Sequence, residues 1–268
     1  MKTIRVNLGK RSYDIIVGYR IIKSLSNFLT SLNIGKDAYI ITNPLIKKIY
    51  GKLLEQSLVR GGFSVRFKPI PDTEKSKSIE TATSVLKNIA AYNRQKRVFI
   101  IAFGGGVIGD LAGFVASVYK RGVPYIQIPT TLLAQVDSSI GGKTAVDLIE
   151  AKNVIGAIYQ PRLVLSEIEF LKTLDIRQIR NGLAEVIKYS LIKDKKMFEY
   201  LERNYKYILR KRPSSLEYII LRSSAIKAKI VEQDEREEKG IRTFLNFGHT
   251  VGHAIEAADF ITTERQLH

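Results

Sequence analysis

Residues 104–147 read GGGVIGDLAGFVASVYKRGVPYIQIPTTLLAQVDSSIGGKTAVD, and this stretch is the most informative part of the chain. The strand-like segment 98–103 runs directly into Gly104, Gly105 and Gly106, and a helix-like run follows. Glycine lets backbone amides approach a ligand closely, and amides at the start of a helix favour phosphate. We therefore predict a nucleotide- or phosphate-binding turn here, with catalytic side chains in the same stretch.

The chain around this stretch alternates between strand-like and helix-like segments. The expected strands are 2–18 (a pair joined by a turn at Gly9-Lys10), 37–42, 63–70, 98–103 and 124–129, and the expected helices are 20–33, 44–60, 78–93 and 107–122. A polar loop is expected after residue 129. Such alternation predicts an α/β fold with a parallel sheet covered on both faces. Ligands of such sheets lie beyond the carboxyl ends of the strands.

The pattern changes after about Leu171, where helical periodicity takes over. The expected helices of this second half are 175–194, 196–211, 214–232 and 242–259. We therefore predict two domains, a Rossmann-like α/β domain over residues 1–172 and an α-helical domain over residues 173–268.

Composition narrows the class of protein. The 268 residues are 45% hydrophobic, an ordinary share for a globular protein. No apolar run reaches about 18 residues, so no membrane helix is expected, and the N-terminus alternates like strands rather than resembling a signal peptide. The absence of cysteine excludes disulfides and thiolate metal ligands and makes the cytoplasm the expected compartment.

The formal net charge is +17, from 43 basic and 26 acidic residues. A solvated cationic surface and a basic cleft that attracts anionic substrates both account for this excess. The basic residues are spread along the chain and no recognised nucleic-acid motif appears, so no nucleic-acid partner is expected.

All three histidines lie in the last 20 residues. His249 and His253 are four apart in NFGHTVGHAIE, which places them one turn apart on one face of a helix. Neutral imidazole is the commonest metal ligand in proteins, although ordinary helical histidines account for such a pair more often than a metal site does. The flanking glycines and the adjacent Asn246 favour a functional role.

Glu185 and Lys188 are three apart in GLAEVIKYSLIK and share a helical face. One interpretation is a surface salt bridge of small energetic value. The other is a zinc ligand, because a carboxylate with two imidazoles is a common catalytic zinc set that leaves a coordination position open.

The polar residues Asp110, Asp137, Lys143, Lys152 and Asn153 form a third group. GGKT at 141–144 suggests a phosphate loop, but the first glycine of the P-loop spacing is replaced by Asp137, which excludes a P-loop NTPase. The two lysines still suit phosphate binding as point charges. A further segment, PDTEKSK at 71–77, taken alone predicts a turn and a helix start.

With these motifs in hand, the sequence resembles the 3-dehydroquinate synthase family of the shikimate pathway. The matching motifs are GGGVIGDLAGF, KRGVPYIQIPTTLLAQVDSSIGGKTAVD, KNVIGA, NGLAEVIKY, DERE and LNFGHTVGHAIE. The resemblance implies an N-terminal Rossmann-like domain, a C-terminal helical domain and an active site in the cleft between them. It also implies conversion of 3-deoxy-D-arabino-heptulosonate 7-phosphate to 3-dehydroquinate and phosphate, with catalytic NAD and a divalent metal, usually zinc, with cobalt as an alternative.

The resemblance assigns roles to individual residues. The implied metal ligands are Glu185, His249 and His268, and His253 is implied in proton transfer. The implied catalytic residues are His253 together with Asp137, Lys188 and Asn246, which hold the substrate hydroxyls. The implied substrate contacts are Lys143, Lys152 and Asn153 for the phosphate and Lys227 and Arg242 for the carboxylate. Arg121 is implied to reach the active site of a neighbouring subunit, and hence a homodimer. The implied cofactor contacts are Asn43, Glu74, Lys77, Gly105, Gly106, Val107, Asp110, Thr130, Thr131, Lys143, Lys152, Phe170 and Thr173.

The chain departs from the family pattern at two places. It stops at His268, where the family continues with further helices, so the resemblance implies a C-terminally truncated chain. DEREEKGIR also carries one extra residue before Arg242, which shifts the expected alignment of Glu237 by one. Another sugar-phosphate cyclase and a metal-dependent polyol dehydrogenase are the alternative functions.

Overall fold

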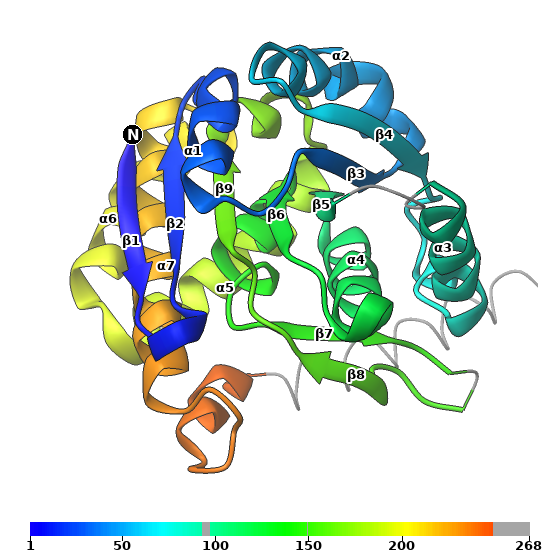
Figure 1. The fold of residues 1–268 in the computed structure, drawn as a ribbon. Helices are drawn as coiled ribbons and strands as arrows, with labels where there is room; N and C mark the ends of the chain where they lie inside the picture. The colour runs from blue at the N-terminus through cyan, green and yellow to red at the C-terminus, as the bar shows by residue number, and fades with distance from the viewer. Residues whose placement is uncertain (93–96, 149, 249–268) are drawn as a thin grey trace, which may run out of the picture.

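The computed structural model describes residues 1–92, 97–148 and 150–248. Its centre is a seven-stranded sheet with the order β1-β2-β9-β6-β5-β3-β4 (Figure 1). Every neighbouring pair in this sheet is parallel except β1 and β2. The strands of the sheet are β1 (Lys2–Val6), β2 (Tyr13–Gly18), β3 (Asp37–Thr42), β4 (Ser64–Pro69), β5 (Val98–Gly104), β6 (Tyr125–Pro129) and β9 (Leu163–Glu167). The predicted parallel α/β sheet is confirmed.

The helices follow the predicted segments closely. They are α1 (Leu25–Leu32), α2 (Pro44–Arg60), α3 (Ile79–Tyr92), α4 (Gly106–Val118), α5 (Ile176–Lys193), α6 (Lys195–Leu209) and α7 (Pro213–Gln233). Short helical turns are η1 (Gly9–Arg11), η2 (Ile22–Ser24), η3 (Glu74–Ser76), η4 (Tyr119–Arg121), η5 (Ala134–Ser138), η6 (Ile168–Thr173) and η7 (Ile241–Asn246). Among the described residues, no helix is long and apolar enough to cross a membrane.

The sheet is covered on both faces because successive side chains of a strand point to opposite sides. On β5, Phe99 and Ile101 pack with α1 and α2 in one core, whereas Ile100 and Ala102 pack with α3 and α4 in another. All four side chains are fully buried. This two-sided burial is why the strand is a continuous apolar run rather than an alternating one.

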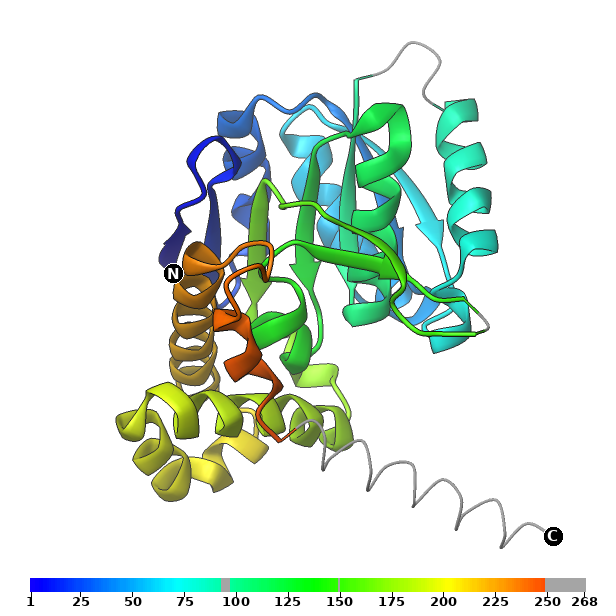
Figure 2. The ribbon, with the colours of Figure 1, turned by 90° about the horizontal axis from the view of Figure 1, so that it is seen from below.

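The helical half of the chain packs against the β1–β2 side of the sheet (Figure 2). Val6 and Tyr13 of the strand pair share one hydrophobic core with Ile219 and Val231 of α7. The predicted boundary near 171–175 falls between η6 and α5. The division into domains 1–172 and 173–268 stays a prediction, and the expected helix 242–259 lies largely outside the described residues.

The sequence predicted a polar loop after β6, and this prediction is wrong because the segment has regular structure. This segment forms the π-helical turn η5 and an antiparallel hairpin, β7 (Lys143–Val146) with β8 (Ile155–Ile158). The strands of the hairpin, KTAV and IGAI, have only four residues each, which is too short to show a clear alternating pattern, so the sequence signal is weak. The hairpin forms because β7 packs on α4, a contact that no local signal encodes. Gly141 and Gly142, with φ of +99° and +71°, turn the chain into β7.

The packing of α4 on β7 leads to a stability prediction. A Cβ atom added to Gly113 would overlap Cγ2 of Thr144. We expect Gly113→Ala to lower the free energy of unfolding by about 1–3 kcal/mol, measured by urea denaturation. Gly51→Ala in α2 is the matched control, because its Cβ would approach only the flexible Lys47 side chain, at 3.2 Å. That control should be neutral or stabilising by up to about 1 kcal/mol, and equal losses in both variants would contradict the prediction.

Candidate functional site

A cavity of about 630 Å³ opens beyond the carboxyl ends of β3, β5 and β6, next to the glycine turn. We call it the glycine-turn cavity. It contains every predicted cofactor contact except Lys143 and Lys152. These lining residues are Asn43, Glu74, Lys77, Gly105, Gly106, Val107, Asp110, Thr130, Thr131, Phe170 and Thr173. Residues up to 130 positions apart in sequence therefore meet at one sheet edge, as expected for a parallel sheet.

Hydrogen bonds of Asn43 and the close approach of Gly105 to Thr131 shape the glycine-turn cavity. Asn43 caps α2 by accepting a hydrogen bond from the Ile46 amide at 2.7 Å. Its side-chain amide donates to Oδ2 of Asp72, also at 2.7 Å. Gly105 caps α4, and a Cβ there would lie 3.1 Å from Cγ2 of Thr131, so a larger residue would narrow the cavity. Asp72 also lines the cavity and was missed, because the segment 71–77 looks like an ordinary turn.

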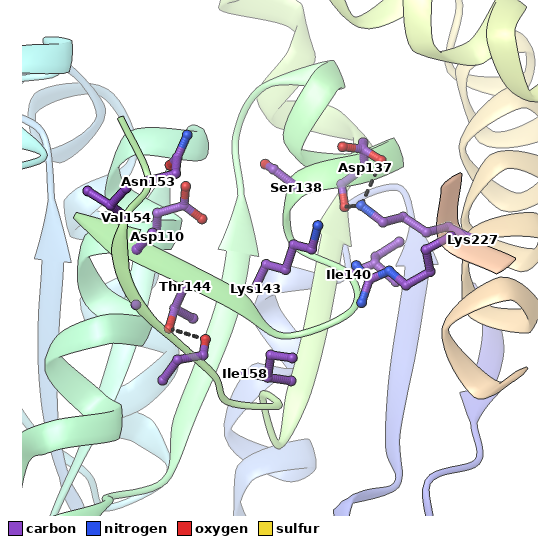
Figure 3. Close-up of a pocket in the computed structure, with 14 residues that line it drawn as sticks. Asp110, Asp137, Ser138, Ile140, Lys143, Thr144, Asn153, Val154, Ile158 and Lys227 are labelled. Atoms are coloured by element: carbon purple, nitrogen blue, oxygen red, sulfur yellow. Dashed lines mark hydrogen bonds and ion pairs between the residues drawn. The ribbon is translucent and has the colours of Figure 1, made fainter. Parts of the chain in front are cut away.

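A second cavity of about 560 Å³ lies between the β7–β8 hairpin, η5 and α7 (Figure 3). We call it the charged cavity. Its polar lining residues are Asp110, Asp137, Ser138, Lys143, Thr144, Asn153, Lys227 and Arg242. Three predicted cationic substrate contacts therefore line the same cavity: Lys143, Lys227 and Arg242. Ser138 and Thr144 were not predicted.

Asp110 and Lys77 connect the two cavities. Asp110 lines both of them, and its Oδ2 lies 2.6 Å from Nζ of the buried Lys77. Lys77 also donates a hydrogen bond to Oδ1 of Asn153, which lines the charged cavity. Burial raises the pKa of Asp110, although the charge of Lys77 opposes this shift. The Lys77–Asp110 ion pair therefore forms a charged wall between the two cavities, next to a ligand bound in either one.

Asp137 is the central carboxylate of the charged cavity. Its Oδ1 accepts hydrogen bonds from Nζ of Lys227, at 2.6 Å, and from the hydroxyl of Tyr189. Lys227 also donates to the Asp137 carbonyl at 2.7 Å. Burial acts to raise the pKa of Asp137, but the charge and hydrogen bond of Lys227 and the bond from Tyr189 outweigh it and lower the pKa. Asp137 is therefore a carboxylate at neutral pH.

Glu237 joins two cations of the charged cavity. Its Oε1 lies 2.5 Å from Nζ of Lys143 and 3.1 Å from Nε of Arg242. Arg242 is buried, and its NH1 donates to the carbonyl of Glu235 at 2.9 Å. The extra residue in DEREEKGIR thus still leaves Glu237 within reach of the cavity, at a left-handed φ of +64°.

Glu185 and Lys188 pair on one face of α5, as their spacing predicts. Only 15% and 7% of their side chains are exposed, so the solvated surface bridge is wrong. Nζ of Lys188 also donates to the carbonyl of Leu245 at 2.7 Å. Neither residue lines the charged cavity.

Four further predicted residues lie outside the glycine-turn cavity, and one of them, Lys143, lines the charged cavity. Lys152 is exposed beside Asn153 and lines neither cavity, and Lys143 lines the charged cavity only. Asn246 is exposed in η7, and Arg121 is exposed in η4, outside both cavities.

Two of the three predicted metal ligands, His249 and His268, lie outside the described residues, as does His253. Within residues 1–92, 97–148 and 150–248, no group of three or more His, Cys, Asp or Glu side chains is placed to hold a metal ion. Glu185 is the one predicted ligand among them, and its ligand role stays a prediction.

Comparison with known proteins decides the family. Residues 68–181 match the 3-dehydroquinate synthase N-terminal family model, and residues 182–266 match the 3-dehydroquinate synthase C-terminal family model. The chain belongs to the 3-dehydroquinate synthase family. A 3-dehydroquinate synthase of Pelotomaculum thermopropionicum is 49% identical over 257 residues, which cover 96% of this chain and 69% of that relative.

Solved structures similar to this family member include two sugar-phosphate cyclases. The 2-epi-5-epi-valiolone synthase of Streptomyces hygroscopicus subsp. jinggangensis, with NAD+ and Zn2+ bound, has a TM-score of 0.81 at 30% identity, covering 91% of this chain and 67% of that one. A 2-deoxy-scyllo-inosose synthase, in complex with carbaglucose-6-phosphate, NAD+ and Co2+, has a TM-score of 0.88 at 27% identity, covering 96% and 71%.

Proposed function

We propose that the chain catalyses the 3-dehydroquinate synthase reaction, in which 3-deoxy-D-arabino-heptulosonate 7-phosphate gives 3-dehydroquinate and phosphate. The observation that carries the proposal is the pair of adjoining cavities that share Asp110. One has the glycine turn and helix start suited to a dinucleotide, and the other is lined by the cations Lys143, Lys227 and Arg242. A substrate with both a phosphate and a carboxylate suits the second cavity.

The glycine-turn cavity is the proposed site for NAD. Gly105 and Gly106 place backbone amides of the α4 N-terminus at the cavity wall, where a pyrophosphate is stabilised. When bound there, NAD would supply hydride-transfer chemistry for oxidation and re-reduction of the substrate. Lys77 and Asp110 lie at the shared wall and would orient the reacting end of the substrate toward the cofactor.

The charged cavity is the proposed site for the substrate. Lys143 and Asn153 would bind the phosphate, with Lys152 approaching from the exposed loop beside it. Lys227 and Arg242 would bind the carboxylate, and Asp137 would accept a hydrogen bond from a substrate hydroxyl. Lys188 and Asn246 are proposed contacts to the other hydroxyls.

A divalent metal is proposed to be held by Glu185, His249 and His268. The bound metal supplies a Lewis acid that polarises the substrate hydroxyl. His253 is proposed to move a proton near the phosphate. Arg121 is exposed and would be available to a second copy of the chain, so a homodimer is part of the proposal.

A phosphate-release assay tests this function. The heptulosonate phosphate is supplied in large excess over NAD, with and without a chelator. Release beyond the NAD supplied, abolished by the chelator, is the expected result. No release would refute the proposal and favour the alternatives. Turnover of another heptulose or hexose phosphate would identify a different cyclase, and net NADH formation with a simple polyol would identify a dehydrogenase.

The ion pair at the shared wall leads to a prediction on cofactor affinity. Lys77→Gln removes the 2.6 Å ion pair with Asp110 while keeping a polar side chain. We expect the Kd for NAD to rise roughly tenfold, because the partly buried Asp110 carboxylate loses its counter-charge next to the cofactor. Competition of NAD against bound NADH, followed by NADH fluorescence, measures this change. The exposed Lys75→Gln serves as control, and an equal rise in both variants would contradict the prediction.

A further inference from the structure

Tyr189 is a buried phenol below the charged cavity that no proposed role uses so far. It lies on α5, has no exposed surface and lines neither cavity. Its hydroxyl donates a hydrogen bond to Oδ1 of Asp137, which lies 52 positions earlier in η5. Among the residues that the structure describes, Tyr189 is therefore linked to the cavity through the Asp137 carboxylate.

The two oxygens of Asp137 are used differently. Oδ1 accepts from both Tyr189 and Lys227. No residue in the described part of the chain donates to Oδ2 of Asp137. The Asp137 side chain keeps 25% of its surface exposed and lines the charged cavity, beside Lys227 (Figure 3). Within the described residues, one oxygen is thus occupied and the other is available to a ligand.

This arrangement restricts a side chain that is otherwise free to turn. The terminal torsion of an aspartate is broad and has no strongly preferred angle. Two donors that converge on one oxygen, from α5 and from α7, fix the plane of the carboxylate. Burial and the neighbouring Asp137 charge raise the pKa of Tyr189 well above its usual value, so the phenol stays a hydrogen-bond donor at physiological pH.

We propose that Tyr189 is a positioning residue, which holds the Asp137 carboxylate through Oδ1 so that Oδ2 faces the charged cavity and accepts a hydrogen bond from a hydroxyl of the polyhydroxylated substrate. The identity of that substrate rests on the proposed function. The Tyr189–Asp137 link rests on the hydrogen bond and the burial alone.

Tyr189→Phe tests the link, since it removes the hydroxyl and leaves the ring in place. We expect kcat/KM for phosphate release to fall roughly tenfold, because a hydrogen bond to a charged group is lost. The decisive measurement repeats this substitution in the Asp137→Asn background. There the further fall should be less than about twofold, because a residue that acts through Asp137 shows a non-additive effect.

The matched control is Tyr39→Phe. Tyr39 is also fully buried, and its hydroxyl donates to Oδ1 of Asn88 at 2.7 Å, away from both cavities. Its activity should stay within about twofold of the wild type. A tenfold fall for Tyr189→Phe in both backgrounds, or no fall in either, would overturn the proposal.

A failure of the proposed function gives a different result. If the wild type releases no phosphate, thermal unfolding is measured instead for the wild type, Tyr189→Phe, Asp137→Asn and the double variant. Non-additive changes in Tm for Tyr189→Phe and Asp137→Asn would support the link without the reaction. Additive changes would overturn it.

Discussion

Replacing Lys227 with methionine is expected to lower kcat/KM for phosphate release by roughly a hundredfold, which corresponds to about 2.7 kcal/mol. Lys227 is buried on α7, and its ammonium holds both Oδ1 and the carbonyl of Asp137. The substitution keeps an unbranched side chain that is one atom shorter, and it leaves the carboxylate without its counter-charge. It also removes a cation that the anionic substrate would meet. Steady-state phosphate release measures the effect.

The same variant has a defined pH dependence of stability. Burial acts to raise the pKa of Asp137, and Lys227 overrides it, so the pKa in the folded protein is lowered. A carboxylate with a lowered pKa stabilises the fold above its unfolded-state pKa of about 3.9, and this contribution is lost as the pH falls through the folded-state pKa. Wild type and Lys227→Met should therefore differ in free energy of unfolding at pH 7, and the difference should shrink as the pH falls below about 3.9 and through the lower folded-state pKa of Asp137.

Lys229→Met provides the control for this prediction. Lys229 lies two residues further along α7 and is exposed. Its loss should change kcat/KM by less than about twofold, since an exposed charge contributes little. Equal activity of Lys227→Met and Lys229→Met would show that the Asp137 pair is not part of the site.

Glu167→Ala is expected to lower the free energy of unfolding by about 3–5 kcal/mol. Glu167 ends β9 and is fully buried. Its carboxylate accepts hydrogen bonds from the backbone amides of Arg20 at 2.7 Å, Ile22 at 2.9 Å and Glu169 at 2.9 Å. Truncation would leave three backbone donors without an acceptor. Urea denaturation measures the loss.

The substitution should also affect the cofactor. Glu167 holds the start of η6, which carries Phe170 and Thr173 of the glycine-turn cavity. We therefore expect weaker NADH binding in Glu167→Ala, even at temperatures where the variant is folded. Glu202→Ala, at an exposed position of α6, is the control and should be within about 0.5 kcal/mol of the wild type. A similarly small change in Glu167→Ala would contradict the role given to this carboxylate.

The part of the fold that the sequence predicted well has strong local signals. The segment DAYIIT at 37–42 coincides with β3, and 44–60 coincides with α2, which begins at a proline after the capping Asn43. The hairpin β7–β8 was missed because its strands have only four residues each, too short for a periodic pattern, and because β7 packs against α4. Sequence periodicity therefore predicts helices and strands that are long enough to show a repeating pattern of apolar residues. It fails for short strands whose position depends on packing against another element.

The resemblance to the 3-dehydroquinate synthase family implied which residues meet at the carboxyl edge of the sheet, whereas the sequence by itself determined the glycine turn and the parallel sheet. These follow from local rules, because strands that alternate with helices place all their carboxyl ends on one side. Only the tertiary structure decided that Asp137 pairs with Lys227, 90 positions later, and with Tyr189. It also decided that Asp110 is shared by two cavities. Such contacts join residues from separate helices and turns, and their geometry is set by how the core packs rather than by spacing along the chain.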